Sequence, residues 1–338
     1  MGGNAFEGLV RLEKKAFLEY EAEVIGWLSE KFEKTAPTKY FTSKDSFGDL
    51  DVLVEKPKLD RAEFEDWLSS KGVDPQTEIK YNSDVISFKF KDFQTDLIFV
   101  PTQFFETAQF YYSYNDLNNL AGRISHKFGV KFGWDGLTYQ IRTEGGQRAK
   151  KIQLSTCPRS IYEFLDLDYD RWLNGFETLE DIFAFIESSK YFNPTIYAFE
   201  NLNNINRTRN RKRKTYQEFI TRLENKEYAT YYEFCRDKSA YLIKIQNAFP
   251  EGDVLGELKK FAEESKKHDE RKEKFNGKLV MELTGATGPE VGKLIGEFKR
   301  EIEAIFGQSF DECIDTRSIK QVRLMYLDFL KNGRTKND

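Results

Sequence analysis

The sequence predicts an α+β protein, with a mixed sheet and its helices in the N-terminal half and a mainly helical C-terminal half. Three observations lead to this prediction. Helical spacing of apolar residues opens the chain, short β-rich runs lie between residues 50 and 100, and helical spacing returns and dominates after residue 155. With 338 residues, of which 39% are apolar, the chain is long enough for two or three domains.

The elements of the first half follow from local patterns. Apolar residues recur every three or four positions over residues 6–32, which predicts one long amphipathic helix. Strands are expected at residues 50–54, 85–91 and 94–100, with a helix near residues 61–70. The last two strands are joined by a tight turn at Asp92, so they are expected to form a hairpin.

Later segments are expected to be mostly helical. Helices are predicted from about residue 103 and over residues 115–128, and a second hairpin is predicted to turn at Asp135-Gly136. Beyond residue 155 the strand signals mostly disappear. The expected domains are therefore residues 1–155, residues 156–250 with a basic cluster, and residues 251–338.

Composition narrows the class of protein. No apolar run reaches the roughly 18 residues that a membrane-spanning helix needs, so no membrane partner is expected. The N-terminus lacks the pattern of a secretion signal, and the expected location is cytoplasmic. Cys157, Cys235 and Cys313 share no metal-ligand spacing and are expected to be buried free thiols. The net charge of -4 gives no overall attraction to nucleic acid, so any such attraction must come from local clusters of basic residues.

Two acids stand inside a strand-like run. In an extended strand Asp49 and Asp51 point to the same face, with Cβ atoms roughly 6.5 to 7 Å apart. Carboxylates held this close need a neighbouring cation. Asp96 stands in a similar setting in a later strand, so three acids from two strands could surround two Mg²⁺ ions. The alternative is that Asp49 and Asp51 lie at an exposed strand end.

Such an arrangement suits phosphoryl or nucleotidyl transfer, in which two metal ions hold the attacking and leaving oxygens. A cation on a helix after the third acid could neutralise a triphosphate as pyrophosphate leaves. Arg123 and Lys127 are the candidates for this nucleotide-binding role.

The pattern resembles the nucleotidyltransferase fold of the DNA polymerase beta superfamily, which has a turn, then Asp-x-Asp on a strand, then a third Asp on a later strand. The resemblance implies a nucleotidyltransferase-type mixed sheet in which Asp49 and Asp51 bind both metal ions. It also implies that Asp96 holds the catalytic ion beside the attacking hydroxyl. Thr42-Ser43 replaces the family's glycine-serine turn, and Ser43 with Lys44 is the expected triphosphate contact.

A second resemblance lies in residues 277–298, GKLVMELTGATGPEVGKLIGEF. This segment is similar to a glycine-punctuated region of tRNA nucleotidyltransferases, the CCA-adding enzymes, and of their poly(A) polymerase relatives. Gly288-Pro289 is expected to begin a helix whose free amides could receive a nucleic-acid phosphate. The alternative is a helix-packing contact that needs small residues.

A basic run lies between these two regions. Six cations within eight residues could bind a polynucleotide backbone, although such a run is also common on a solvated face. The predicted RNA-binding residues are Arg207, Arg209, Arg211, Lys212, Arg213 and Lys214.

These features predict a nucleotidyltransferase that uses ATP, with CTP as a second donor, and two Mg²⁺ ions to extend an RNA 3′ end. The first candidate acceptor is tRNA, as in CCA addition or repair. Two alternatives remain open: modification of a protein or small molecule, as by toxins and antibiotic-modifying enzymes, and a non-catalytic nucleic-acid-binding protein.

Overall fold

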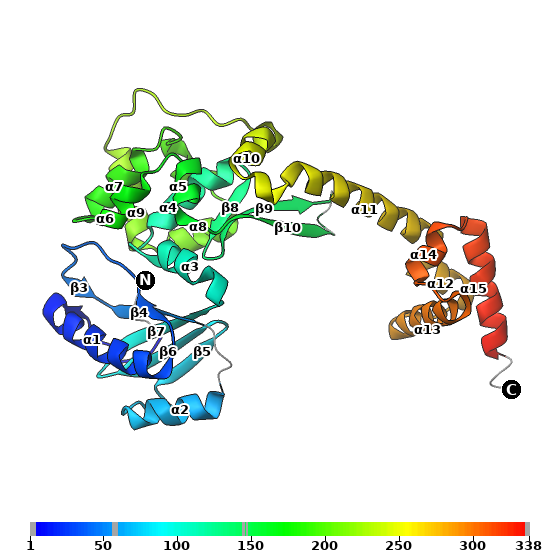
Figure 1. Cartoon of the computed structure of the whole chain (residues 1–338), viewed down its shortest axis with the longest axis horizontal. Helices are drawn as coiled ribbons and strands as arrows, with labels where there is room; N and C mark the ends of the chain where they lie inside the picture. Colours follow the sequence, from blue (N-terminus) through cyan, green and yellow to red (C-terminus); the bar gives the residue numbers. More distant parts are fainter. Residues whose placement is uncertain (1–4, 56–59, 144–145, 147, 335–338) are drawn as a thin grey trace. The chain divides into compact units, whose positions relative to one another are not determined.

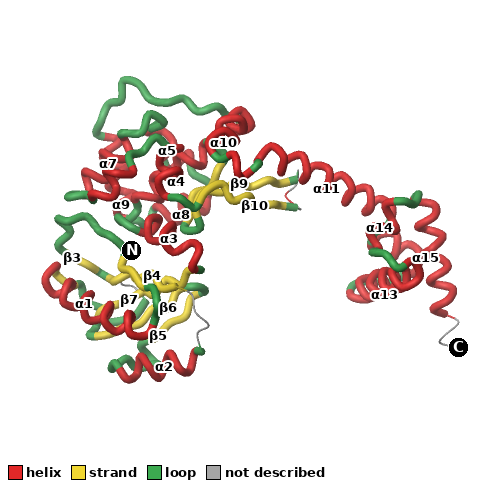
Figure 2. The backbone as a smooth tube through the Cα atoms, in the orientation of Figure 1, coloured by secondary structure: helices red, strands yellow, loops and turns green. Residues whose placement is uncertain are grey.

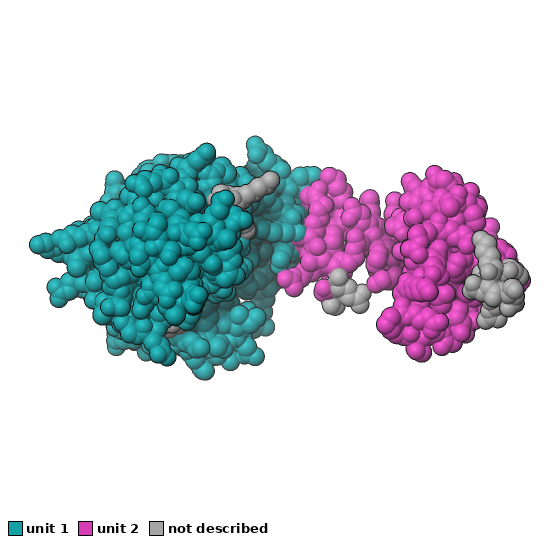
Figure 3. Space-filling view, turned by 90° about the horizontal axis from the view of Figure 1, so that it is seen from below, with its two compact units in different colours: residues 1–140, 151–254 teal, residues 141–150, 255–338 magenta. Residues whose placement is uncertain are grey.

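A computed structural model of the chain describes residues 5–55, 60–143, 146 and 148–334. The chain divides into two compact units, which Figure 3 shows in teal and magenta. The first unit comprises residues 1–140 and 151–254, and the second comprises residues 141–150 and 255–338. The first unit thus holds both the strands and the helices that the sequence pattern assigns to separate domains around residue 155.

A five-stranded mixed sheet forms the base of the first unit, with the strand order β2-β4-β7-β6-β5 (Figures 1 and 2). Strands β4 and β7 are parallel, and the other neighbours are antiparallel. The hairpin predicted around Asp92 is confirmed, because Lys91 and Asp92 connect β6 to β7 with positive φ angles of 50° and 57°. The strands are β2 (Thr35–Pro37), β4 (Asp49–Glu55), β5 (Ile79–Asn82), β6 (Val85–Phe90) and β7 (Phe93–Val100).

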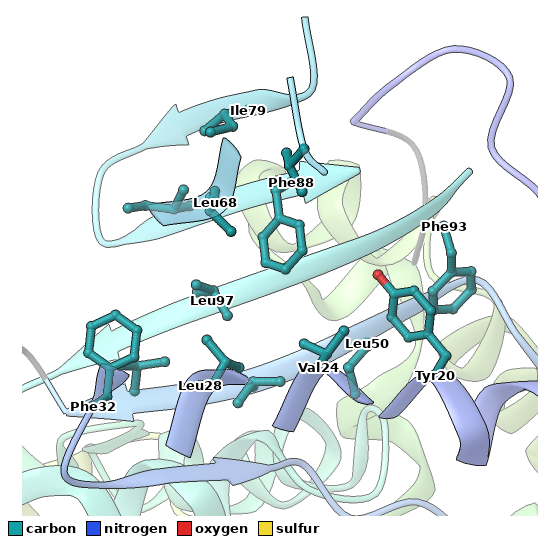
Figure 4. Close-up of a cluster of buried hydrophobic side chains, with 14 of the residues drawn as sticks. Tyr20, Val24, Leu28, Phe32, Leu50, Leu68, Ile79, Phe88, Phe93 and Leu97 are labelled. Carbon is teal, nitrogen blue, oxygen red and sulfur yellow. The ribbon is translucent and has the colours of Figure 1, made fainter. Parts of the chain in front are cut away.

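One face of this sheet is covered by the helices α1 (Lys14–Lys31) and α2 (Arg61–Ser70). Val24 of α1 packs with Leu50 and Leu97 of the two parallel strands, and Figure 4 shows these side chains in the common core. All three are at most 2% exposed. This burial fixes the facing of β4, because a slip of one residue would turn its apolar side chains away from the core.

The opposite face of the sheet is partly covered by α3 (Phe105–Tyr112), which follows β7 through the short 3-10 helix η1 (Thr102–Phe104). Leu53 of β4 and Ile98 of β7 pack on this face against α3. Alternate residues of a strand share a face. Asp49 and Asp51 therefore lie on the α3 side together with Leu53, as Asp96 does with Ile98.

Helices fill most of the rest of the first unit, together with the larger part of a small sheet of strand order β10-β9-β8. The strands of this sheet are β8 (Val130–Gly133), β9 (Gly136–Arg142) and β10 (Ala149–Ser155). The helices are α4 (Leu117–Lys127), α5 (Pro158–Phe164), α6 (Tyr169–Asn174), α7 (Leu179–Glu187), α8 (Asn204–Asn210), α9 (Lys214–Glu224) and α10 (Leu242–Ala248), with the 3-10 helices η3 (Pro194–Tyr197), η4 (Phe199–Asn201), η5 (Lys238–Tyr241) and η6 (Pro250–Gly252).

The second unit is mainly helical and has its own core around Phe275, Phe298 and Tyr326. The helix start predicted at Gly288-Pro289 is confirmed, since Gly288 has a φ of 58° and Pro289 is the first residue of α13. The helices are α11 (Val254–Lys274), α12 (Gly277–Thr284), α13 (Pro289–Phe306), α14 (Phe310–Asp315) and α15 (Ile319–Arg334).

The mixed α+β class and the helical C-terminal half are confirmed. Several details differ from the sequence-based expectation. The first helix begins at Lys14 rather than residue 6, and the short strands β2, β5 and β10 were not predicted. Cys313 is buried as expected, but Cys157 and Cys235 are exposed, so the prediction was wrong for these two thiols. Within the described ranges, every helix is too short or too polar to cross a lipid bilayer.

Candidate metal centre and its surroundings

The three predicted acids form a compact cluster. On the parallel strands β4 and β7, Asp51 is the direct register partner of Asp96, and Asp49 stands two residues before Asp51. One carboxylate oxygen from each acid can be chosen so that all three lie within 4.8 Å of one another. The parallel pairing brings together two segments 45 positions apart in the chain, and the donor set consists entirely of hard oxygen ligands.

Burial and mutual repulsion oppose the charged form of Asp51. Burial, followed by the negative charges of Asp49 and Asp96, raises the pKa of Asp51 to about 8, while Lys44 opposes the shift. Burial also raises the pKa of Asp96. A divalent cation would relieve this repulsion and displace the proton that the cluster otherwise retains. The three side chains therefore fit a site for a hard divalent cation.

Two polar neighbours on the same sheet support Asp96. Gln94 Nε2 donates to both carboxylate oxygens of Asp96, at 2.9 and 3.0 Å, and Gln94 Oε1 accepts a hydrogen bond from the backbone N of Ala5 at 2.8 Å. Ser87, the register partner of Asp96 on β6, also favours its charged form by hydrogen bonding. Neither residue was predicted from the sequence, although the strand period of two places Gln94 on the same face as Asp96.

Lys44 lies within electrostatic reach of the acid cluster, and its predicted role as a triphosphate contact stays a prediction. Asp49 and Asp51 both favour its charged form, although burial is the larger effect and lowers its pKa. The Lys44 ammonium also lies 4.5 Å from the ring centroid of Phe47, which is buried and stacks on Phe17. A cation on an aromatic face next to two carboxylates is well placed to bind phosphate oxygens.

Arg11 is a basic neighbour that the sequence analysis missed. Its positive charge lies close enough to Lys44 to help lower the pKa of that lysine. Its guanidinium donates to the side-chain hydroxyl and to the backbone carbonyl of Ser46, each at 3.0 Å. The short antiparallel pair β1 (Leu12–Glu13) and β3 (Ser46–Phe47) holds this segment next to the loop before β4. Arg11 could not be predicted as a neighbour of this site, because the contact joins residues that are far apart in sequence and local sequence patterns do not reveal such contacts.

Ser43 lies in an exposed turn with a fixed backbone. Its N–H donates to the carbonyl of Glu177 at 2.8 Å, and the N–H of Thr42 donates to the carbonyl of Phe176 at 2.9 Å. These bonds tie the turn to the segment between α6 and α7. The Ser43 side chain remains exposed, and Ser43 directly precedes Lys44 in the chain.

Tyr112 connects the acid cluster to the basic run and was not anticipated. It ends α3 and packs beside Leu53 and Ile98 on the sheet face that carries the acids. Burial, then Tyr111 and Asp51, raise the pKa of Tyr112 to about 12, and the positive charge of Arg209 opposes the shift. The ring therefore lies within electrostatic reach of both Asp51 and Arg209.

The six cations of the basic run separate into different settings. Arg209 is exposed and close to Tyr111 and Tyr112. Arg213, four residues later, forms an ion pair with Asp116, which is 7% exposed. Lys212 and Lys214 are exposed.

The other two arginines of the run line a different surface. Arg207 donates to the carbonyls of Phe199 and Leu202, at 3.0 and 2.8 Å. Arg207 and Arg211, with Phe199 and Glu200, line an open pocket of about 360 Å³. The run is thus not one uniform phosphate-binding surface.

Arg123 and Lys127 lie together on α4, near His126 and Lys238. Arg123 is 7% exposed, and its charge interacts with Tyr197 and Tyr216 of the helical layer. The electrostatic partners that shift the pKa of Asp51 and Asp96 do not include these two cations. Their predicted role as nucleotide contacts stays a prediction.

No protein-family model matches the chain, and a search of curated proteins finds no match.

Proposed function

We propose that this protein is a Mg²⁺-dependent nucleotidyltransferase that transfers a nucleoside monophosphate from an NTP to an RNA 3′ end, with tRNA as the acceptor. The catalytic part is the first unit, whose mixed sheet we assign to the nucleotidyltransferase type. The observation that carries the proposal is the cluster of Asp49, Asp51 and Asp96, in which oxygens from two parallel strands converge within 4.8 Å.

The acids have distinct proposed roles. Asp49 and Asp51 hold two Mg²⁺ ions, and Asp96 lies beside the acceptor hydroxyl, oriented by Gln94 through two hydrogen bonds. When bound, the ions supply neutralisation of the triphosphate and activation of the hydroxyl. Orientation by Gln94 matters because a carboxylate must keep its geometry while the charge around it changes.

The donor nucleotide is proposed to bind beside the turn before β4. In this proposal Lys44, with the positive charge of Arg11 nearby, faces the β- and γ-phosphates, and the exposed Ser43 hydroxyl donates to them. ATP is the expected donor, with CTP as a second one.

The acceptor is proposed to approach along Tyr112 and Arg209. A tyrosine ring can stack on a base, and an exposed arginine can pair with a backbone phosphate. Tyr112 lies within electrostatic reach of both Asp51 and Arg209. This combination favours a polynucleotide over a protein side chain or a small molecule, and the glycine-punctuated start of α13 supports a folded RNA such as tRNA.

A comparison of acceptors tests this proposal. The protein is incubated with Mg²⁺, one labelled NTP at a time, and equal concentrations of tRNA lacking its terminal CCA, intact tRNA or an unstructured oligonucleotide. We expect preferential labelling of the truncated tRNA. Equal labelling of the unstructured oligonucleotide would favour a general RNA-tailing enzyme, whereas labelling of the protein itself or of a small molecule would contradict the RNA assignment.

A further inference from the structure

A group of basic side chains on the helical layer has no acidic partner among the described residues. It consists of Arg123, His126 and Lys127 of α4 and Lys238 of η5, and we call it the α4 basic cluster. Residues three and four apart on a helix share a face, so the three α4 side chains project together. Their mutual interactions with Lys238 show that the segment 115 positions later joins the same group.

Arg123 is the least exposed member of the cluster. It is 7% exposed, and its Nε is buried without a hydrogen-bond partner in the described part of the chain. An unpaired buried donor costs free energy of folding, and the cost is larger when the donor belongs to a charged group than when it belongs to a neutral group. The groups that favour the charged form of Arg123 are the phenols of Tyr216 and Tyr197, which do not supply a full negative charge at neutral pH.

Close packing holds Lys238 in the cluster. Gly129 follows the end of α4 with a φ of +86°, and a Cβ added there would lie 3.3 Å from Cβ of Lys238. Glycine thus permits both the backbone conformation and the close approach of the lysine. Desolvation and the positive charges of Lys238, Arg123 and Lys127 lower the pKa of His126 to about 4. The imidazole is therefore neutral at pH 7, with one ring nitrogen that can donate a hydrogen bond and one that can accept one.

We propose that the α4 basic cluster is a binding site for a phosphate group, distinct from the acid cluster. The positive charges of Arg123, Lys127 and Lys238 repel one another. A phosphate would offset this repulsion and accept charge-assisted hydrogen bonds from the two lysines. The phosphate belongs to a free nucleotide or to a polynucleotide backbone. This inference does not depend on nucleotide transfer.

The two histidines of the chain provide a direct test by NMR of the full-length protein at pH 7. His126 reports on the cluster, and His268, which lies on α11, serves as the internal reference. The probes are inorganic phosphate, ATP and a short single-stranded RNA. We expect each probe to shift the His126 imidazole signals saturably and to leave those of His268 unchanged. Tighter binding of ATP than of RNA would identify a nucleotide site, and the reverse would identify a polynucleotide site.

Matched variants separate a built site from general surface charge. Lys127→Gln and Lys238→Gln should each weaken phosphate binding about tenfold, as expected for the loss of a charge-assisted contact. Lys131→Gln, which removes an exposed charge on β8, should not change it. Asp51→Asn should also bind phosphate normally, so this result is independent of the proposed function. A His126 signal that responds to none of the probes, or equal affinity in all four variants, would overturn the proposal.

Discussion

Asp51 of β4 and Asp96 of β7 are register partners on adjacent parallel strands. This pairing sets two carboxylates side by side on the sheet face that α3 covers only in part. Asp49 adds a third carboxylate from the same strand, and the oxygens converge within 4.8 Å. Burial, followed by the repulsion of Asp49 and Asp96, raises the pKa of Asp51 to about 8.

Asp51→Asn should abolish nucleotide transfer and leave the fold intact. The substitution removes one metal-binding charge with little change in shape, and it also removes charge repulsion, so the metal-free protein should not lose stability. Activity and circular dichroism of the variant check both points. Asp269→Asn, an exposed acid of α11, is the matched control. Near-normal transfer by Asp51→Asn would rule out the metal-centre assignment.

Asp96→Ala should also lose transfer but retain part of its NTP binding, because Asp49, Asp51 and Lys44 remain. NTP affinity measured in the presence of Ca²⁺, which supports binding at oxygen ligands, separates the two effects. If Asp96→Ala and Asp51→Asn lost NTP binding equally, the proposed division of roles between the acids would be wrong.

Stability in the absence of metal should fall as pH rises from about 4 to 8. Because the folded-state pKa of Asp51 lies above its ordinary value of 3.8, the native state binds more protons than the unfolded state in this window. Mg²⁺ should therefore raise the melting temperature more at pH 8 than at pH 6. Thermal unfolding checks this, with Asp51→Asn as the control in which the pH trend is reduced. An identical Mg²⁺ effect at both pH values would contradict the charge account.

Arg213→Ala should destabilise the first unit by about 2 kcal/mol, since it leaves the buried Asp116 carboxylate without its ion-pair partner. Arg211→Ala, which removes an exposed side chain of the same run, should change stability by less than about 0.5 kcal/mol. Denaturant unfolding measures both. The double variant Asp116→Ala with Arg213→Ala should recover part of the loss, and no recovery would show that the ion pair is not the cause.

Arg209→Ala should weaken RNA binding and flatten its salt dependence. Losing one phosphate contact should reduce the slope of log affinity against log salt by about 0.7 on a single strand or about 0.9 on a duplex. Lys15→Ala removes an exposed cation from α1, which covers the other face of the sheet, and should leave the slope unchanged. An unchanged slope for Arg209→Ala would show that this arginine is an ordinary solvent-exposed residue that does not contact RNA phosphate.

Much of the acid cluster could be predicted because strand periodicity alone fixes the shared face of Asp49 and Asp51. The apolar run around Asp96 identified its strand for the same reason. Parallel pairing of the two strands could not be predicted from local pattern, because it depends on the whole order of the sheet. The supporting contacts of Arg11 and Tyr112 were missed for the same physical reason: they join segments that are distant in sequence.

The basic run shows where composition misleads. Six cations within eight residues predict one phosphate-binding surface. In the structure, Arg213 instead pairs with Asp116, and Arg207 donates to backbone carbonyls. Sequence spacing counts these charges correctly, but tertiary contacts decide which of them remain available to a ligand.

The most direct test of metal-dependent nucleotidyl transfer is to follow the label from an NTP with Mg²⁺ and tRNA lacking its terminal CCA. The wild-type protein should incorporate label from the α-phosphate but not from the γ-phosphate, and it should release an equal amount of pyrophosphate. Asp51→Asn should neither incorporate the α-phosphate label nor release pyrophosphate. Transfer of the γ-phosphate, or α-phosphate incorporation that persists in Asp51→Asn, would contradict the assignment of the acid cluster as the centre of nucleotidyl transfer.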